Sequence, residues 1–425
     1  MWAWATTAAT VGLLLATPPQ KPEAIEQGFI KTVCYVGRGN RFRVNSPDVA
    51  TGPYRDRWEA KQAGEMALRV DGDPSHARAA ELYLELWGGH PGVARKRFTL
   101  NGKSTYLLPE VGAAAKHCTY SYPSVPLRPE ELVRGPNVLR FSCDRGTTFW
   151  GHYLIRAACL RLAVGGDDPA IAQAGLVGFR ATVSTRAAGE ERVRLALRCP
   201  DPMRDRIEAV EYWGRYHGYD ERGDGRRDDF HGFTKDLVPA GILGRVDVPP
   251  FEMVWDLGMV ADSRDLAARA VVRFKGVDNL LYVTEPTPPV AFPQRSTTVR
   301  LVYADALPRP FWSRAGHKKT CVLTLDKDPG RIERAQLHIT VWDGGAGSVT
   351  SPLRVNREPL PTPSWRGRHD LIYTVIELDP TVLRRGGNEV QVYSDTRHHG
   401  IEVCLPGPAL MVRLRAPRGD KEPVR

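Results

Sequence analysis

The clearest candidate for metal chemistry is a run of acidic residues after position 219. Asp220, Asp224 and Asp228 recur at intervals of four, and Gly225 follows the second of them. Carboxylates spaced along a loop supply the hard oxygen ligands that Ca²⁺ prefers, and glycine permits the sharp turn that such a loop needs. Asp229 offers a further oxygen. The spacing therefore predicts a calcium loop with these four aspartates as ligands.

Two residues of the same run argue against a metal ion. Arg222 stands where a calcium loop normally has Asp or Asn, and His231 stands where a bidentate Glu is expected. Arg222, Arg226 and Arg227 can instead neutralise the carboxylates directly, which would make a metal ion redundant. The sequence leaves two interpretations open: a weak calcium site, or a charged loop held by arginine–aspartate pairs.

Aromatic residues surround this acidic run. They are Tyr212, Trp213, Tyr216, His217, Tyr219, Phe230, His231 and Phe233. Sugars present apolar C–H faces that stack on aromatic rings, while their hydroxyls need polar partners, so this mixture is typical of a glycan-binding surface. Tyr219 and His231 are the candidate ligand-binding residues of the cluster. Tyr212, Trp213 and Tyr216 are better explained as members of a protein core.

An internal repeat is visible from residue spacing alone. At a constant offset of 255, Asp71, Asp73, Pro74, Ala80, Leu82, Trp87, Gly89 and Asn101 match Asp326, Asp328, Pro329, Ala335, Leu337, Trp342, Gly344 and Asn356. At an offset of 251, Leu127, Pro129, Leu132, Gly135, Asn137 and Asp144 match Leu378, Pro380, Leu383, Gly386, Asn388 and Asp395. Agreement of rare residue types at fixed spacing is improbable by chance. Residues 30–165 and 296–416 are therefore predicted to be two copies of one fold.

Each copy is predicted to consist of strands. Leucines alternate with other residues in segment 81–87, and apolar residues alternate likewise in segment 337–341, which is the period of two that a strand facing a core requires. Asn101 and Asn356 each follow a strand, and asparagine tolerates the positive φ of a tight hairpin. The aspartates before Pro74 and Pro329 are expected to form turns rather than an acid and base pair.

The order of these elements resembles the galactose-binding-like jelly-roll sandwich, a family of carbohydrate-binding modules and accessory domains of glycosidases and polysaccharide lyases. Its clearest piece is Leu-x-Pro-x-x-Leu followed by Gly-x-Asn, at 127–137 and 378–388. The middle segment 170–295 has a different strand pattern, which looks like an immunoglobulin or fibronectin-type sandwich. The predicted fold class is therefore all-β: three β-sandwich domains, with two outer jelly rolls (30–165 and 296–416) around a central immunoglobulin-like domain (170–295).

Loop residues of the two copies are further binding candidates. They follow the matched aspartates of the repeat, so the same edge of each sandwich is expected to carry a polar or aromatic loop, and loops on a rigid sandwich are where such folds bind ligands. The candidates are Trp150 and His152 in the first copy and Arg397, His398 and His399 in the second. These side chains could instead cap the core. Trp87 and Trp342 lie inside the repeated strand and are predicted to be structural.

Motifs of common enzyme classes are missing from the sequence. It contains no Gly-x-Ser-x-Gly, no phosphate-binding glycine loop and no His-Glu-x-x-His, and no carboxylate pair identifies itself as the acid and base of a glycosidase. The net charge is +10, but basic residues alternate with acidic ones, as in Arg55-Asp56-Arg57, so no nucleic-acid-binding arm is predicted.

The ends of the chain and its cysteines bear on location. Residues 1–20 form a short apolar run followed by prolines, which suits an export signal, and residues 417–425 read as a disordered tail. No later window is long and apolar enough for a membrane helix.

The seven cysteines include no Cys-x-x-Cys. In the sandwich that the copies resemble, first and last strands commonly neighbour each other, which implies a disulfide between Cys321 and Cys404.

These observations favour a secreted, periplasmic or cell-surface protein that binds a polysaccharide or other glycan, or serves as a scaffold, without catalysis. Two equivalent sandwich edges in one chain could raise avidity for a repetitive polymer. One alternative is a glycan-degrading enzyme, a glycoside or glycan-amide hydrolase or a polysaccharide lyase, with its site between sandwiches. Another is a structural adhesion protein. Calcium is the single cofactor that the sequence suggests.

Overall fold

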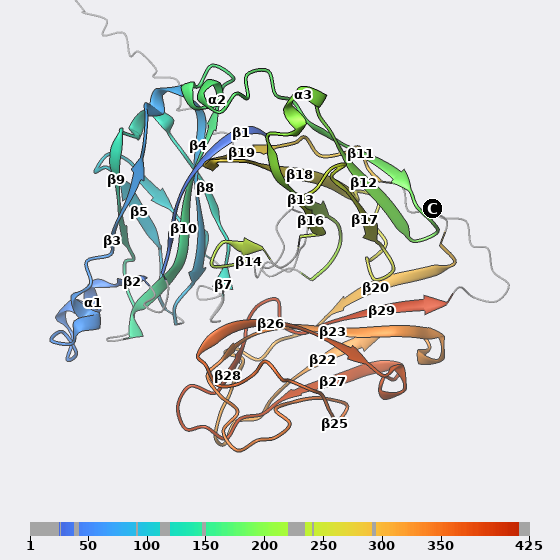
Figure 1. The fold of residues 1–425 in the computed structure, drawn as a ribbon. Coiled ribbons are helices and arrows are strands. Elements are labelled where there is room, and N and C mark those ends of the chain that lie inside the picture. Colours follow the sequence, from blue (N-terminus) through green and yellow to red (C-terminus); the bar gives the residue numbers. More distant parts are fainter. Residues whose placement is uncertain are drawn as a thin grey trace, which may run out of the picture.

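A computed structural model describes residue 25 and residues 27–37, 42–90, 92–110, 120–146, 150–219, 234–239, 242–290 and 295–415. Strands predominate in this part of the chain, which confirms the predicted all-β class (Figure 1). Its α-helices are short: α1 (Pro47–Thr51), α2 (Pro169–Gln173) and α3 (Asp201–Arg204). Within the described residues, no helix reaches the length and apolar character that a membrane span needs.

Several predicted features lie outside the described residues. They are the signal peptide at 1–20, the tail at 417–425, and the acidic run with Asp220, Asp224, Asp228, Asp229 and His231. The calcium loop therefore stays a prediction. Among the residues that are described, no group of three or more His, Cys, Asp or Glu side chains is arranged to hold a metal ion.

The first copy contains two antiparallel sheets that enclose a core. One sheet has the order β3 (Glu65–Val70), β9 (Gly135–Ser142), β5 (Arg97–Leu100) and β6 (Thr105–Leu107). The other contains β1 (Gly28–Val36), β10 (His152–Val164) and β4 (Ala77–Trp87), with β2 (Phe42–Asn45) beside β10 and with β7 (Tyr120–Ser121) and β8 (Ser124–Leu127) beside β4. Leu82, Leu84 and Leu86 of β4 pack between the sheets, as the period of two predicts.

The second copy repeats this arrangement. Its first sheet has the order β22 (Lys319–Leu325), β27 (Gly386–Val392), β24 (Leu353–Val355) and β25 (Glu358–Pro359). Its second sheet contains β20 (Thr297–Tyr303), β29 (Ala409–Arg415), β23 (Ile332–Asp343), β26 (Asp370–Leu378), β28 (Ile401–Val403) and β21 (Trp312–Ser313). Trp87 and Trp342 lie at the ends of the equivalent strands β4 and β23, so the predicted equivalence of these two residues is confirmed.

The matched aspartates and prolines of the repeat form turns, as predicted. Asp73 caps the 3-10 helix η2 (Pro74–His76) by accepting a hydrogen bond from the backbone N–H of Ser75, and Asp328 caps η5 (Pro329–Arg331) by accepting one from Gly330. Each turn leads directly into the long central strand of its copy. Proline at the first helical position and a capping aspartate before it explain why this pair recurs.

The matched asparagines form one hydrogen-bond network in each copy. Asn101 and Asn356 have φ of 51° and 52°, as the hairpin prediction requires. Asn101 donates to Oδ1 of buried Asn137 at 2.9 Å, and Asn356 donates to Oδ1 of buried Asn388 at 2.8 Å. Because each network joins a hairpin to the 3-10 helix before the next strand, both η3 (Pro129–Glu131) and η6 (Pro380–Val382) are fixed by side chains rather than by sheet pairing.

Replacement of Asn388 by alanine is expected to lower the free energy of unfolding by about 2 kcal/mol, because Asn388 is fully buried and the backbone groups that it bonds lose their partners. These groups include the N–H and carbonyl of Arg384. Chemical denaturation measures the change. Arg385→Ala, at an exposed neighbouring position, is the control and should change stability by less than about 0.5 kcal/mol. Equal effects of the two variants would contradict the role given to the network.

The middle segment shares a sheet with the first copy, which the sequence did not reveal. The ten-stranded sheet runs through β16 (Gly244–Val246), β13 (Ile207–Arg215), β18 (Ala267–Phe274) and β19 (Val277–Val283) into β1 and β10. A second, small sheet contains β11 (Thr182–Ala187), β12 (Arg192–Arg198) and β17 (Glu252–Asp256). Phe29 of β1 contacts the rings of Phe179 and Tyr282, and one hydrophobic core extends through both segments.

The second copy has a core of its own and meets the first copy at a smaller apolar contact. Trp87, Tyr120 and Leu154 of the first copy pack there with residues of the second copy, which are Trp312, Trp342, Leu371, Tyr373 and Cys404. The middle segment adds a short hairpin, β14 (Thr234–Lys235) and β15 (Val238–Pro239), that reaches the first copy. Trp87 of β4 and Trp342 of β23, which end equivalent strands, thus both belong to the contact between the copies.

The predicted Cys321–Cys404 disulfide is wrong. Cys321 lies on β22 in one sheet of the second copy, whereas Cys404 follows β28 in the opposite sheet, and both are buried free thiols. The first strand that pairs with the last strand, β29, is β20, which carries no cysteine. A disulfide instead joins Cys34 and Cys159, which face each other in register on β1 and β10 with Cα atoms 4.1 Å apart.

Candidate functional site

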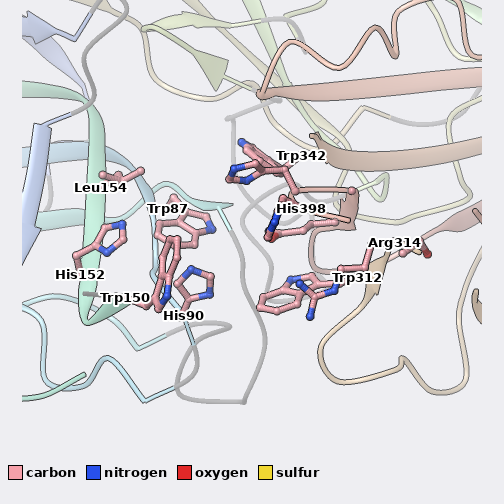
Figure 2. A pocket seen from close by; sticks show the side chains of 13 residues that line it. Trp87, His90, Trp150, His152, Leu154, Trp312, Arg314, Trp342 and His398 are labelled. Carbon is pink, nitrogen blue, oxygen red and sulfur yellow. The ribbon is translucent and has the colours of Figure 1, made fainter. Parts of the chain in front are cut away.

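A cavity of about 590 Å³ lies where the two copies meet. In Figure 2, one wall carries Trp87, His90, Trp150 and His152, and the facing wall carries Trp312, Arg314, Trp342 and His398. The remaining lining residues are Leu154, Ser313, His399, Gly400 and Glu402. Each copy contributes two tryptophans, so neither copy forms the site alone.

The repeat explains how the two walls arise. Trp87 ends β4, and Trp342 lies at the end of the equivalent strand β23. Leu154 of β10 pairs with Trp87, and Glu402 of β28 pairs with Trp342, so the lining positions also correspond between the copies. The cavity is thus built from two equivalent sheet edges that face each other. The two edges present different side chains to the cavity because the loops after these strands differ in sequence.

The matched glycines Gly89 and Gly344 bring the backbone close to the cavity. A Cβ atom on Gly89 would lie 2.4 Å from the carbonyl oxygen of His152, and one on Gly344 would lie 2.5 Å from that of Gly400. Either contact is shorter than any side chain allows, so only glycine fits. Since His152 and Gly400 occupy equivalent places, Trp150 and His398, each two residues earlier, are equivalent loop residues.

His90 lies at the centre of the aromatic cluster. Its ring centroid is 5.1 Å from that of Trp87, 5.4 Å from that of Trp150 and 5.5 Å from that of Trp312, with edge-to-face geometry in each case. Burial, with a smaller contribution from the charge of Arg43, lowers the pKa of His90 to about 4. The imidazole is therefore neutral at pH 7, with one ring nitrogen donating and the other accepting hydrogen bonds.

The wall from the second copy also combines aromatic and basic groups. The ring of Trp342 lies 5.7 Å from that of His399, and the guanidinium of Arg314 lies 5.4 Å from the centre of Trp312. Burial lowers the pKa of His399, and the neighbouring His369 and His398 lower it further. His399, like His90, is neutral at pH 7.

A buried arginine supports the first wall from behind. Arg43 of β2 is 8% exposed, its Nε donates to Asn45 Oδ1 at 2.7 Å, and its Nη1 lies 3.4 Å from Nε2 of His152. Burial lowers the pKa of Arg43 to about 10, but the guanidinium remains charged at pH 7. Because the ring nitrogen facing it is an acceptor, this contact orients the imidazole of His152 toward the cavity.

The charged lining residues are few. Among the described residues that line the cavity, Arg314 is the single permanent cation and Glu402 is the single carboxylate. On the opposing wall the position that corresponds to Glu402 is occupied by Leu154, which is uncharged. The cavity therefore offers flat aromatic faces, neutral imidazoles and one ion of each sign.

The loop residues predicted from the sequence largely meet at this cavity. Trp150, His152, His398 and His399 line it, although they are far apart in the chain. Arg397 is exposed beside them and does not line it.

Tyr219 lies elsewhere, buried between the middle segment and the second copy, where it stacks on Tyr373. Its hydroxyl donates to the carbonyl of Gly407 at 2.9 Å and accepts from the N–H of Thr340 at 3.0 Å. Its place is therefore in the packing of the segments. His231 lies outside the described residues.

Sequence reasoning identified four of the thirteen lining residues as binding candidates. His90, Trp312, Arg314 and Glu402 were not identified, and Trp87 and Trp342 were assigned to structure alone. The repeat contained a usable signal, because a tryptophan followed two residues later by a glycine ends the matched strand in both copies. A side chain at the end of a strand can pack against the core and also contact a ligand.

A polar network joins all three segments next to the apolar contact between the copies. Arg156 sits at a β-bulge in β10, and its guanidinium donates to Asp236 of the middle segment at 2.6 and 3.0 Å and to Asp370 of the second copy at 2.9 Å. Lys235 also donates to Asp370. Bulges re-aim side chains, and here the bulge turns Arg156 toward both partners. We call these four residues the Arg156 network.

The hairpin tip that carries Asp236 is held by a buried carboxylate. Asp236 and Leu237 both have positive φ, 55° and 65°, and the carboxylate of Glu85 on β4 accepts their N–H groups at 2.7 and 2.8 Å. Burial raises the pKa of Glu85 to about 7 in spite of these hydrogen bonds. Leu237 packs against Tyr83 and Cys159, so the tip is fixed by apolar and polar contacts together.

Comparisons with known proteins do not assign the chain to a family. No family model matches it, and no curated protein matches it. A β-porphyranase of glycoside hydrolase family 86 from the gut bacterium Bacteroides plebeius aligns at 16% identity over 55% of this chain and 36% of that chain, with a TM-score of 0.25.

Two other solved structures align no better. BuGH86 in complex with neoagarooctaose aligns at 13% identity over 61% of this chain and 35% of its own, with a TM-score of 0.25. An FMN-binding β-glucuronidase from Faecalibacterium prausnitzii aligns at 11% identity over 57% and 39%, with a TM-score of 0.20. The chain thus spans little more than a third of these structures, and TM-scores this low establish neither a common fold nor a common function.

Proposed function

We propose that the protein binds a glycan in the cavity between the two copies and does not cleave it. The observation that carries this proposal is the convergence of four tryptophans, two from each copy, around one cavity that also holds histidines, Arg314 and Glu402. Aromatic faces stack on the C–H faces of sugar rings, and the polar groups between them hydrogen-bond the hydroxyls. A volume of about 590 Å³ suits a small ligand or the end of a longer one.

The charge of the cavity favours neutral sugars. His90 and His399 have lowered pKa values, so at pH 7 they donate and accept hydrogen bonds without adding charge. Arg314 and Glu402 carry opposite charges. An acidic glycan would gain from Arg314 but would meet Glu402 in the same cavity. Neutral hydroxyls can use both groups, because a carboxylate accepts and a guanidinium donates.

A binding role is favoured over hydrolysis by the carboxylate count. A glycosidase ordinarily needs two carboxyl groups flanking the scissile bond. Among the described lining residues, Glu402 is the single carboxylate. The enzyme alternative makes a different prediction: incubation with glycans would release shorter products, which chromatography detects.

An extracellular setting is part of the proposal. Disulfides persist in oxidising compartments, and the Cys34–Cys159 pair joins two central strands. The apolar run at 1–20 agrees with export. Secretion into culture medium or periplasm, followed by N-terminal sequencing of the mature chain, tests this part separately.

Replacement of Trp312 by alanine is expected to weaken glycan binding at least tenfold, because a buried aromatic contact contributes about 2 kcal/mol or more. A glycan array identifies ligands of the wild type, and isothermal titration calorimetry then measures affinity. Leu107→Ala removes an apolar side chain that is 68% exposed and does not line the cavity, so it is the control. Equal affinity of the two variants, or release of shortened products by the wild type, would contradict the proposed function.

A further inference from the structure

Three exposed aromatic residues in the part of the chain that the structure describes belong to one edge of the first copy. Among the described Phe, Trp and Tyr side chains, the exposed ones are Tyr54 at 45%, Trp58 at 65% and Trp150 at 49%. Trp150 lines the cavity. Tyr54 lies in the loop that follows α1, and Trp58 begins the 3-10 helix η1 (Trp58–Lys61) at the end of that loop; we call residues 52–61 the α1–η1 loop. Large exposed aromatic groups are costly in water, so their collection at one place indicates a contact surface.

This loop is anchored to the strand and segment that carry the cavity wall. The side chain of Asn45 donates to the carbonyl of Glu59 at 2.8 Å and accepts from Arg43, whose guanidinium lies against His152. The N–H of Ser46 donates to the carbonyl of Gly151 at 2.7 Å, next to Trp150. Figure 1 shows α1 beside β2 at the lower end of the first copy. The loop is therefore a fixed continuation of the cavity wall.

Charge on the loop is balanced, as it is in the cavity. Arg55 and Arg57 flank Asp56, all three are exposed, and Arg57 pairs with Glu59 at 3.5 Å. Polar groups of both signs thus surround two aromatic faces. This is the same combination that the cavity offers, but on an open surface, where an internal sugar of a chain could lie without its ends being enclosed.

We propose that Tyr54 and Trp58 form a second subsite that binds a distant sugar of the same glycan, so that the ligand is a neutral polysaccharide chain rather than a free mono- or disaccharide. This proposal rests on the proposed function of the cavity. Once one end of the chain is bound in the cavity, contact with the second subsite is intramolecular, which raises affinity without a new partner. Affinity should therefore rise with chain length until the chain reaches Trp58.

The experiment compares disaccharides and octasaccharides derived from cellulose, chitin, xylan and agar as probes for calorimetric binding to the full chain. For a series that the wild type binds, Trp58→Ala is expected to weaken the octasaccharide about tenfold and to leave the disaccharide within twofold of the wild type. Tyr54→Ala should act in the same direction. Leu107→Ala, a similarly exposed apolar truncation, should match the wild type for both lengths.

The outcomes separate this proposal from the one on which it rests. If Trp58→Ala binds the octasaccharide like the wild type while Trp312→Ala loses both lengths, the second subsite is overturned and the cavity stands. If Trp58→Ala weakens both lengths equally, Trp58 acts on the cavity itself, and the subsite is likewise overturned. If the wild type binds no probe, both proposals fail.

Discussion

Replacement of Arg156 by alanine is expected to lower the free energy of unfolding by about 3 kcal/mol, because the carboxylate of Asp236 loses the guanidinium that it accepts from and that of Asp370 is left with Lys235. The side chain of Arg156 is 13% exposed, whereas those of the two aspartates are 36% and 33% exposed. Water can reach the aspartates in part, which keeps the cost at the lower end for a buried pair. Arg156→Lys should recover only part of the loss, since lysine cannot donate to both partners in the planar geometry of a guanidinium.

The matched control is Arg334→Ala. Arg334 also pairs with a carboxylate, that of Glu377, but both side chains are more than half exposed, at 52% and 56%. Surface pairs of this kind contribute at most about 1 kcal/mol. Chemical denaturation measures both variants. Because the Arg156 network joins the copies beside the cavity, Arg156→Ala should also weaken glycan binding, and similar stability losses for the two arginines would overturn the role of the network.

The stability of the protein should depend on pH through two groups with opposite effects. The pKa of Glu85 rises from 4.5 to about 7 on folding, mainly by burial. The folded state therefore binds its proton more tightly, and the stability that this contributes is complete below pH 4.5 and is lost as pH rises through 7. The displacement corresponds to about 3 kcal/mol.

His90 has the opposite dependence. Burial lowers its pKa from 6.5 to about 4, so the unfolded chain binds the proton more tightly. Its contribution to stability is complete above pH 6.5 and is lost as pH falls through 4, again by about 3 kcal/mol. Between pH 4.5 and 6.5 the contribution of Glu85 falls while that of His90 rises by nearly the same amount, so their sum changes little with pH in the wild type.

Single variants expose each contribution. Between pH 4 and 8, the unfolding free energy of the wild type minus that of Glu85→Gln should fall by about 3 kcal/mol as pH rises, whereas the difference from His90→Gln should rise by a similar amount. Subtracting the unfolding free energy of the variant from that of the wild type cancels the contributions of the other titrating groups. Urea denaturation at a series of pH values gives both curves. A difference that does not change with pH for either variant would show that its pKa is not displaced on folding.

The sequence by itself determined the elements of the two copies. Spacing alone identified the repeat, and the alternation around Leu82 and Leu84 correctly predicted strand β4. Asn101 and Asn356 adopt the positive φ expected of them, because the preference of asparagine for this conformation is local. The matched aspartates before Pro74 and Pro329 form caps for the same reason. Local conformational preference needs no knowledge of distant residues.

Only the tertiary structure decided which surfaces of these elements meet. In β4, the face opposite the leucines is also buried, because the middle segment covers Tyr83 and Glu85 and the second copy covers Trp87. The alternation of residues in the sequence identifies one buried face of a strand. It cannot show that another segment of the chain covers the opposite face. It likewise could not predict the shared sheet, since β1 pairs with a strand about 250 residues later in the chain.

The candidate site shows the same division. Trp150, His152, His398 and His399 were identified one by one from their positions after repeated residues, but nothing in their spacing indicates that they line one cavity. The cavity exists because two equivalent edges, held by the Arg156 network and by apolar contacts, face each other across the interface. Residue type and local spacing can be read directly from the sequence. Which edges come together depends on the balance of contact energies between distant segments, and that balance is settled only when the chain is folded.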